Sequence, residues 1–437
     1  MKTNNLGRYL QFALVILAAG AIYPLIYLKA QYQETILEVF NMSLTQMNSI
    51  YSVLGLVFVI GYFPSGVLSD KFSAKNLLAL SLLGTGLGGI WFAQVPDYQY
   101  VVFIFAIWGV FSVFTFWSSH MKVVKMLSSV EEDGRFFGIL DGGRGLVEAL
   151  LASFALAIFS SVLGDSNEVS DKKMALESII YMYSTVLLLC SVLVFIFVKD
   201  DSQSAAVATT KKTQDKQKDG FKLSYLGEVF KNKYIYLHGF IIFAGYTVFW
   251  TNYYWGGHLQ SNIGMEPVTV GSIMVAVLWM RPVGGVIGGY LADRIGKEIT
   301  IGGSLLGGCT CLGLMVIFPN TLSSLIISAL VVLSGLFIYM IRGTYWSLLG
   351  QSKINVAIMG TAIGSISFIG YLPDIVIPQI NTYLWNTFGN EGGYQAYFIV
   401  SAVIGLIGVF VTMIYRKAQI VDAGNHKQSP IVGADPA

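Results

Sequence analysis

Charged residues are scarce in this chain: they make up 12% of its 437 residues, about half the share typical of a soluble globular protein. Hydrophobic residues make up 54%. A chain this apolar has too little polar surface to cover itself in water. The composition therefore excludes an ordinary soluble protein and predicts one that lies in a lipid bilayer.

Cysteine is rare as well, and Cys190, Cys309 and Cys311 all fall in apolar runs, so no disulfide framework is expected. The net charge of +2 gives no reason to expect a nucleic-acid partner. The sequence has no Gly-x-x-x-x-Gly-Lys-Ser/Thr loop, no His-Glu-x-x-His pair and no metal-spaced Cys/His cluster. We therefore expect no ATP-driven reaction, no metal, no cofactor and no enzyme activity.

Twelve stretches are long and apolar enough for a transmembrane helix, which needs about 20 residues. They are 7–29, 46–68, 76–95, 100–125, 137–163, 174–198, 234–257, 269–291, 299–318, 323–349, 355–383 and 395–415. Lys and Arg between these stretches lie mostly on the side of the N-terminus, and only Lys29, Lys172 and Lys173 lie on the other. Because cytoplasmic loops are enriched in Lys and Arg, both termini are expected in the cytoplasm.

A polar segment, 199–233, separates the first six predicted spans from the last six. Its first part, 200–220, lacks large apolar residues and is expected to be a flexible cytoplasmic linker. From Phe221 on, apolar residues at helical spacing predict either a short amphipathic helix on the membrane surface or a solvated connector. The polar tail is expected to be disordered after Val421. The predicted units are thus an N-terminal bundle, a C-terminal bundle and a cytoplasmic tail: 1–198, 234–415 and 416–437.

A short motif occurs twice, after the second and after the eighth predicted span. The chain reads Gly66-Val-Leu-Ser-Asp70-Lys71 in the first half and Gly289-Tyr-Leu-Ala-Asp293-Arg294 in the second. Glycine allows close helix approach, the aspartate caps a helix or pairs with a cation, and the basic residue holds the loop at the headgroups. This pattern resembles the loop signature of the major facilitator superfamily. The resemblance extends over the whole chain in span count, division into halves and orientation.

The resemblance implies an all-α, multi-pass membrane protein of twelve helices in two six-helix bundles, each built of inverted three-helix repeats. It also implies alternating access, in which the motif residues gate the cavity, cap helices or do both. Predicted helices 1, 4, 7 and 10 would line the cavity. A further segment, 134–145, is similar to the start of the fifth helix in prokaryotic members that carry organic anions.

Ionisable residues inside apolar spans are costly and usually face a cavity or a partner. Arg281 is the deepest arginine, and we expect it either to bind an anionic group of the substrate or to lock helices in a buried pair. Arg342 is expected to bind the substrate or to snorkel toward the headgroups. Arg144 shares one helix face with Asp141 and Glu148, so we expect it either to form an internal ion-pair ladder that borders the cavity or the eighth helix, or to bind the substrate.

Asp374 lies between two prolines, Pro373 and Pro378, which favour a kink in the eleventh span. A carboxylate beside such a break is a candidate proton or cation site, or it caps the restarted helix. Glu148 and Asp141 are the next proton candidates.

Aromatic residues at helical spacing mark the seventh span: Tyr246, Trp250 and Tyr253 share one face. The resemblance places this span at the cavity, so the face is expected to pack on a substrate together with Tyr23 or Tyr27 of the first span. The alternative is that these side chains mark a membrane interface.

These features together predict a secondary transporter of a small organic anion, driven by a proton or substrate gradient. It is expected to act as a monomer in a bacterial inner membrane, with only the small-molecule substrate, lipid and protons as partners. One alternative is a proton-coupled carrier or exporter of a neutral or amphipathic solute. Another is a membrane sensor without transport, for which the chain offers little soluble output.

Overall fold

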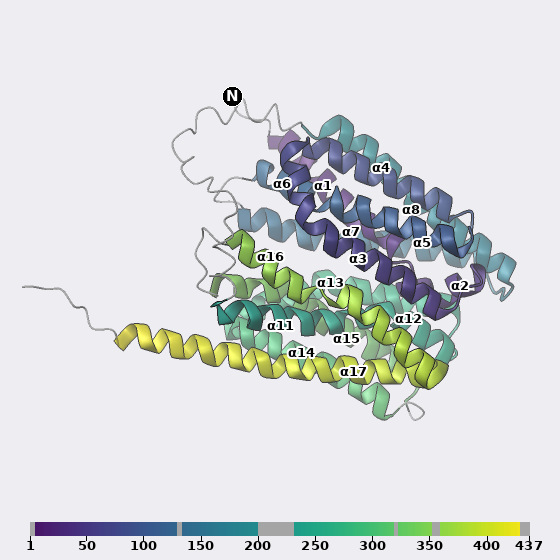
Figure 1. Ribbon diagram of the computed structural model, residues 1–437. Coiled ribbons are helices and arrows are strands. Elements are labelled where there is room, and N and C mark those ends of the chain that lie inside the picture. Colours follow the sequence, from purple (N-terminus) through teal and green to yellow (C-terminus); the bar gives the residue numbers. More distant parts are fainter. Residues whose placement is uncertain (1–4, 129–132, 200–230, 319–321, 352–358, 429–437) are drawn as a thin grey trace, which may run out of the picture.

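The computed structural model describes residues 5–128, 133–199, 231–318, 322–351 and 359–428 of the chain. These residues form helices and no strand. Figure 1 shows two groups of helices that run side by side: α1–α8, which we call the N-group, and α11–α17, which we call the C-group. Residues 5 and 428 lie at one end of the bundle, the terminal end, and we call the other the opposite end. The predicted linker and amphipathic helix lie outside the described residues.

The helices of the N-group follow the apolar stretches of the sequence, because backbone groups in a bilayer must bond within their own helix. They are α1 (Asn5–Ile26), α2 (Lys29–Val39), α3 (Leu44–Lys71), α4 (Ala74–Phe92), α5 (Tyr98–Gly109), the π-helix η1 (Val110–Phe114), α6 (Trp117–Leu127), α7 (Asp133–Leu163) and α8 (Val169–Phe197). Ser43 starts α3 with a capping box shared with Gln46. The first span, predicted to end at residue 29, continues through α2 to Val39.

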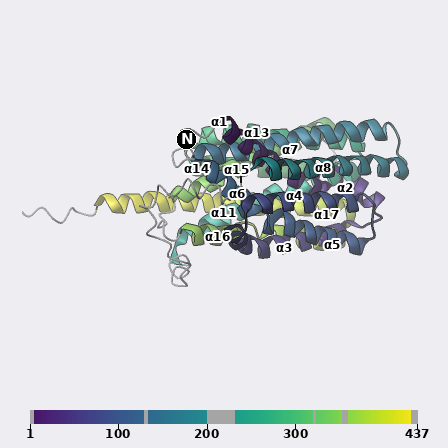
Figure 2. The same ribbon diagram turned by 90° about the horizontal axis from the view of Figure 1, so that it is seen from above.

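The C-group contains more irregular helix than the N-group. Its elements are α11 (Lys233–Trp250), the 3₁₀ turn η2 (Thr251–Tyr253), α12 (Trp255–Gly257), the π-helix η3 (His258–Asn262), α13 (Pro267–Ile295), α14 (Lys297–Ile317), α15 (Ser324–Thr344), η4 (Tyr345–Gln351), α16 (Met359–Gly370) and α17 (Pro373–Gln428). α17 breaks at Gly389, whose φ of 70° suits glycine. Its end projects beyond the bundle (Figure 2). The tail predicted as disordered after Val421 is therefore helical to Gln428.

Nine helical stretches among the described residues are long and apolar enough to cross a membrane. Two of the predicted spans, 355–383 and 395–415, fall largely on a single such stretch, Ser365–Asp422. Two others coincide with α4 and α11, which are helices but do not belong to the nine. The predicted number of twelve spans is therefore not confirmed.

The two groups meet along several helices: α7 packs on α13, α3 on α17, and α2 on α12 and α13. Side chains tie them together at the opposite end. There the Gln33 amide donates to the Tyr394 hydroxyl at 2.5 Å, and the Asn48 amide donates to Asn381 Oδ1 at 2.8 Å. Between these contacts and the terminal end lies a cavity to which both groups contribute.

Candidate functional site

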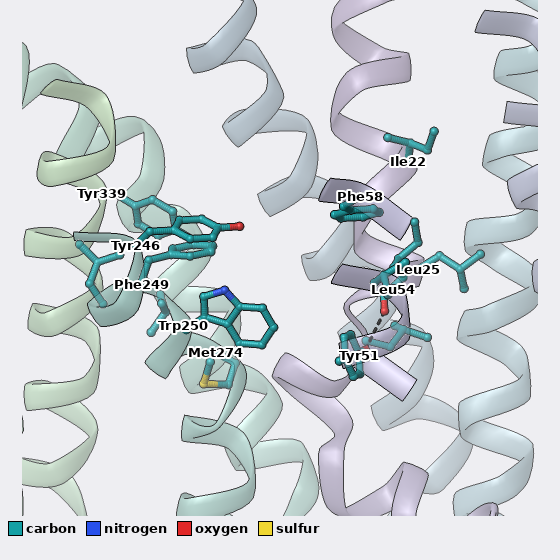
Figure 3. Packing of buried hydrophobic residues seen from close by; sticks show 14 of the residues in the cluster. Ile22, Leu25, Tyr51, Leu54, Phe58, Tyr246, Phe249, Trp250, Met274 and Tyr339 are labelled. Atoms are coloured by element: carbon teal, nitrogen blue, oxygen red, sulfur yellow. Dashed lines mark hydrogen bonds between the residues drawn. The ribbon is translucent and has the colours of Figure 1, made fainter. Parts of the chain in front are cut away.

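A cavity of about 140 Å³ lies between the N-group and the C-group. Aromatic side chains of both groups form much of its wall, among them Tyr23, Tyr62, Tyr246 and Phe249. Figure 3 shows Tyr246 and Phe249 on the C-group side, facing the helix that carries Phe58. Five charged residues complete the lining: Arg144, Glu148, Arg281, Arg342 and Asp374.

Arg281 of α13 is bound by acids of α7. Its Nη1 donates to Glu148 in a short ion pair, and its Nη2 lies 3.3 Å from Asp141 Oδ1. Gly145 makes this possible, because a Cβ there would come within 2.9 Å of the Arg281 side chain. Arg144 Nη2 lies 3.8 Å from Glu148 Oε1. The predicted ladder thus borders the eighth predicted helix, and in it Asp141 pairs with Arg281 while Arg144 lies near Glu148.

Arg342, near the end of α15, has a different environment. Among the described residues no carboxylate lies within ion-pair distance of its guanidinium. Instead, its Cζ lies 4.0 Å from the ring centre of Phe249 and 5.7 Å from that of Tyr246. The cation therefore rests on aromatic faces and borders the cavity.

Asp374, in the first turn of α17, is almost fully buried. Its Oδ1 accepts hydrogen bonds from the Tyr246 hydroxyl at 2.9 Å and from the Trp250 indole Nε1 at 3.1 Å. Both donors are neutral and come from α11. The side chain thus bonds across to another helix, so the interpretation of Asp374 as a cap of its own helix is not what the structure shows.

Most but not all of the aromatic residues predicted to pack on a substrate lie in the cavity wall. Tyr23, Tyr246 and Tyr253 line the cavity. Tyr23 also donates its hydroxyl to the Ser112 carbonyl at 3.1 Å. Trp250 is buried and is not among the residues that line the cavity; its indole donates to Asp374.

Formal charges in and beside the cavity divide into two sets. Arg144 and Arg281 balance Glu148 and Asp141, although the Asp141 side chain is 64% exposed. Arg342 and Asp374 form the second set, which is neutral when the carboxylate is ionised. A proton on Asp374 therefore leaves one uncompensated positive charge at the cavity, which an anion can neutralise.

Sequence reasoning misplaced Lys29. It predicts a loop residue, whereas the structure places this lysine fully buried in α2. Its Nζ has no hydrogen-bond partner and lies 4.1 Å from the ring centre of Tyr51 and 4.2 Å from that of Tyr254. Trp250 and Tyr253 complete an aromatic cage. The tyrosines around Lys29 in the sequence are a signal that could have indicated this burial.

The sequence analysis does not single out Asn252. In the structure it lines the cavity, and both its amide nitrogen and its amide oxygen are buried without a hydrogen-bond partner. A single asparagine in an apolar run gives little indication of such a position.

The repeated motif is described only in its second copy. The surroundings of Gly66 and the side chains of Asp70 and Lys71 lie outside the part of the chain that can be described. Asp293 and Arg294 are exposed at the end of α13, and the Arg294 Cζ lies 4.7 Å from the Tyr290 ring centre. A Cβ at Gly289 would meet nothing within 4 Å. The close helix approach expected there is found instead at Gly284 and Gly288, which lie against Met340 of α15.

Three known proteins show what this chain is similar to. It is 26% identical over 429 residues to the inner membrane protein YqcE of Escherichia coli, covering 97% of this chain and 98% of that protein. It is 25% identical over 248 residues to the cis,cis-muconate transport protein of Acinetobacter baylyi, covering 55% and 57%. Its fold matches the crystal structure of a bacterial homolog to the human lysosomal transporter Spinster, in an inward-facing and unoccupied conformation. That match has a TM-score of 0.74 with 10% identity over 96% of this chain and 99% of that one.

The family model gives the most direct assignment. Residues 9–378, which include the helices around the cavity up to the start of α17, match the model of the Major Facilitator Superfamily. The helical fold and the similarity to membrane proteins and transporters agree with this match. The chain therefore belongs to the Major Facilitator Superfamily of transporters.

Proposed function

We propose that this protein is a secondary transporter of small organic anions and that Arg342 binds the anionic group. One observation carries the proposal: Arg342 faces the cavity with aromatic rings beneath it and no carboxylate within ion-pair distance among the described residues. A guanidinium offers several donors in a planar fork that suits a carboxylate or phosphate. The charge of Arg342 is therefore available to a substrate.

Arg281 has the opposite situation, because Glu148 and Asp141 already compensate its charge. Its proposed role is to join α13 to α7 across the two groups. Arg144, whose nearest carboxylate lies 3.8 Å away and whose Nε has no partner, is a second donor for the anion. The A. baylyi relative is named for transport of cis,cis-muconate, a carboxylate, which supports the anionic class.

The proposed coupling uses Asp374 as the proton-binding group. Its ionised carboxylate offsets Arg342, and a proton would remove that offset while Tyr246 and Trp250 keep the side chain in place. Proton binding and anion binding then favour each other, and this coupling is reciprocal. Alternating access of the cavity between the two groups would carry both species together.

The test is uptake into proteoliposomes of a panel of solutes, with cis,cis-muconate, smaller carboxylates, phosphorylated compounds and neutral sugars. Arg342→Gln is expected to lower kcat/KM for the transported anion by about 10- to 100-fold, because charged hydrogen bonds are lost. Arg416→Gln serves as the control, since Arg416 is an exposed residue of α17 that does not line the cavity. Anion uptake that is equal in Arg342→Gln and wild type would refute the assigned role.

The same assay tests the proton site with Asp374→Asn. The amide oxygen can still accept from Tyr246 and Trp250, and the side chain is permanently neutral. The steady-state accumulation ratio of the anion in wild-type proteoliposomes should increase as the external pH falls below the internal pH, by up to about tenfold per pH unit for one coupled proton. The variant should exchange the anion at a rate independent of that gradient. A gradient response equal to that of wild type would remove Asp374 from the coupling.

A second candidate function follows from the aromatic lining of the cavity, which also suits a neutral or amphipathic solute. The panel separates the two. Uptake of a neutral solute that is unaffected by Arg342→Gln would favour this alternative.

A further inference from the structure

Asn252 is a polar side chain of the cavity wall with no assigned role. It lies in η2, directly after α11, and is 4% exposed. Both its Nδ2 and its Oδ1 are buried without a hydrogen-bond partner. Buried amides are almost always hydrogen-bonded, so an unpaired one that lines a cavity points to a ligand.

The position of Asn252 relative to Arg342 follows from the chain. Phe249, whose ring lies under the Arg342 guanidinium at 4.0 Å, precedes Asn252 by three residues. Residues three apart share a helix face and are displaced by about 5 Å along the axis. Because α11 runs toward the opposite end, Asn252 lies about one turn beyond Phe249 in that direction. Asn252 and Arg342 line the same cavity, so a small solute held at Arg342 can extend to this amide.

We propose that Asn252 binds a second polar group of the substrate, about one helical turn from the anionic group. The inference rests on the proposed function, which supplies the anion at Arg342. The amide offers a donor and an acceptor, so it can pair with a hydroxyl, a carbonyl or a second carboxylate. The substrate class is therefore a hydroxy-, keto- or dicarboxylate rather than a simple monocarboxylate.

This arrangement would let the site discriminate between acids with one polar group and acids with two. A monocarboxylate without a second polar group leaves the amide buried and unpaired when it binds, whereas a bifunctional acid satisfies it. Wild type should therefore bind the bifunctional member of a matched pair at least about tenfold more tightly.

The experiment compares matched acids on the purified full-length protein. The probes are butyrate with 4-hydroxybutyrate and succinate, pentanoate with glutarate, and hexanoate with adipate, in which the second polar group lies several bonds from the first carboxylate. Affinities come from ligand-induced thermal shifts, and uptake into proteoliposomes is measured in parallel. Asn252→Leu should reduce each preference to within about threefold by weakening the bifunctional acids alone. The substitution removes no hydrogen bond seen in the structure, and an apolar group of similar size is compatible with folding.

A second variant separates recognition from a structural role. Asn252→Asp keeps the size of the side chain but adds a negative charge, so dicarboxylates should weaken by at least about tenfold while hydroxy acids change less. A purely structural role would shift both classes alike.

The outcomes also separate this inference from the proposed function. If wild type shows no preference within the pairs, or if Asn252→Leu retains it, the inference is overturned while Arg342-dependent anion transport stands. If no carboxylate binds and Arg342→Gln changes nothing, the proposed function fails and the inference fails with it.

Discussion

Arg281 and Arg342 reach the same cavity from neighbouring helices, and their surroundings give them different roles. Arg281 forms ion pairs with two carboxylates of α7, of which only Glu148 is buried, so loss of Glu148 would leave a buried charge uncompensated. Breaking a buried pair in this way typically costs 3–5 kcal/mol. Among the described residues no carboxylate lies within ion-pair distance of Arg342, whose guanidinium packs on the rings of Phe249 and Tyr246. At the scale of single residues, we infer that the first arginine joins the two groups and the second serves the substrate.

Lys29 provides a prediction at the same scale. Three of the rings around its buried ammonium, those of Trp250, Tyr253 and Tyr254, belong to the C-group. Cation–π contact returns about 2 kcal/mol, less than the several kcal/mol that burying an unpaired charge costs. Lys29→Met should therefore raise the apparent Tm in detergent by about 2–4 °C. It should also slow transport, because it favours the arrangement in which the opposite end is closed.

The measurements for Lys29→Met are thermal unfolding followed by tryptophan fluorescence and the maximal uptake rate. Lys173→Met is the matched control, since Lys173 is an exposed lysine at the opposite end, near Glu177. A lower Tm for Lys29→Met would show that the ammonium stabilises the cage more than its burial costs.

At the scale of helices, part of the site could be predicted from sequence and part could not. The cost of charge in a bilayer indicates that Arg281, Arg342 and Asp374 face a cavity, and all three line it. Which carboxylate pairs with Arg281 depends on how α13 packs on α7, which is a tertiary contact. The sequence therefore did not predict the pairing of Arg281 with Glu148. Trp250 shares a helical face with Tyr246 in the sequence, but the change from α11 to η2 and the packing against Asp374 take it out of the cavity wall.

Gly55 gives a prediction about two helices. A Cβ at this position in α3 would overlap the backbone carbonyl of Asp374 at the start of α17. Gly55→Ala must therefore push these helices apart, with a loss of about 1–3 kcal/mol in the free energy of unfolding. Because the shift acts on the Asp374 backbone, the dependence of uptake on the proton gradient should weaken as well.

Gly303→Ala is the control for this variant, because a Cβ at Gly303 in α14 would meet nothing within 4 Å. Its stability should stay equal or rise slightly, as for alanine in an unhindered helix. Equal stability and equal proton dependence in Gly55→Ala and wild type would show that α3 and α17 are not held by this contact.

At the scale of the whole molecule, the helical fold could be predicted because the bilayer leaves a chain this apolar few alternatives. The repeated motif then identified the family. The predicted number of twelve spans is not confirmed in the same way. α4 and α11 are not among the nine described stretches, and two predicted spans fall largely on one stretch, Ser365–Asp422. The interruption of α17 did follow from the sequence, because Gly389, with its positive φ, lies in the gap that the hydropathy pattern leaves between 383 and 395.

Alternating access requires the opposite end to open, and this can be tested by holding it closed. Thr45 Oγ1 and Asn386 Oδ1 lie 3.3 Å apart across the two groups at an exposed place. Cysteines at these two positions, in a chain without the three native cysteines, should be joined by a short bifunctional thiosulfonate reagent. Uptake should then stop and return on reduction, because one of the two states is no longer accessible.

The control pair, Gln94→Cys with Tyr181→Cys, replaces side chains 2.5 Å apart within the N-group, where a cross-link should leave uptake intact. Continued uptake with Thr45→Cys fully cross-linked to Asn386→Cys would mean that the two groups do not separate there during transport.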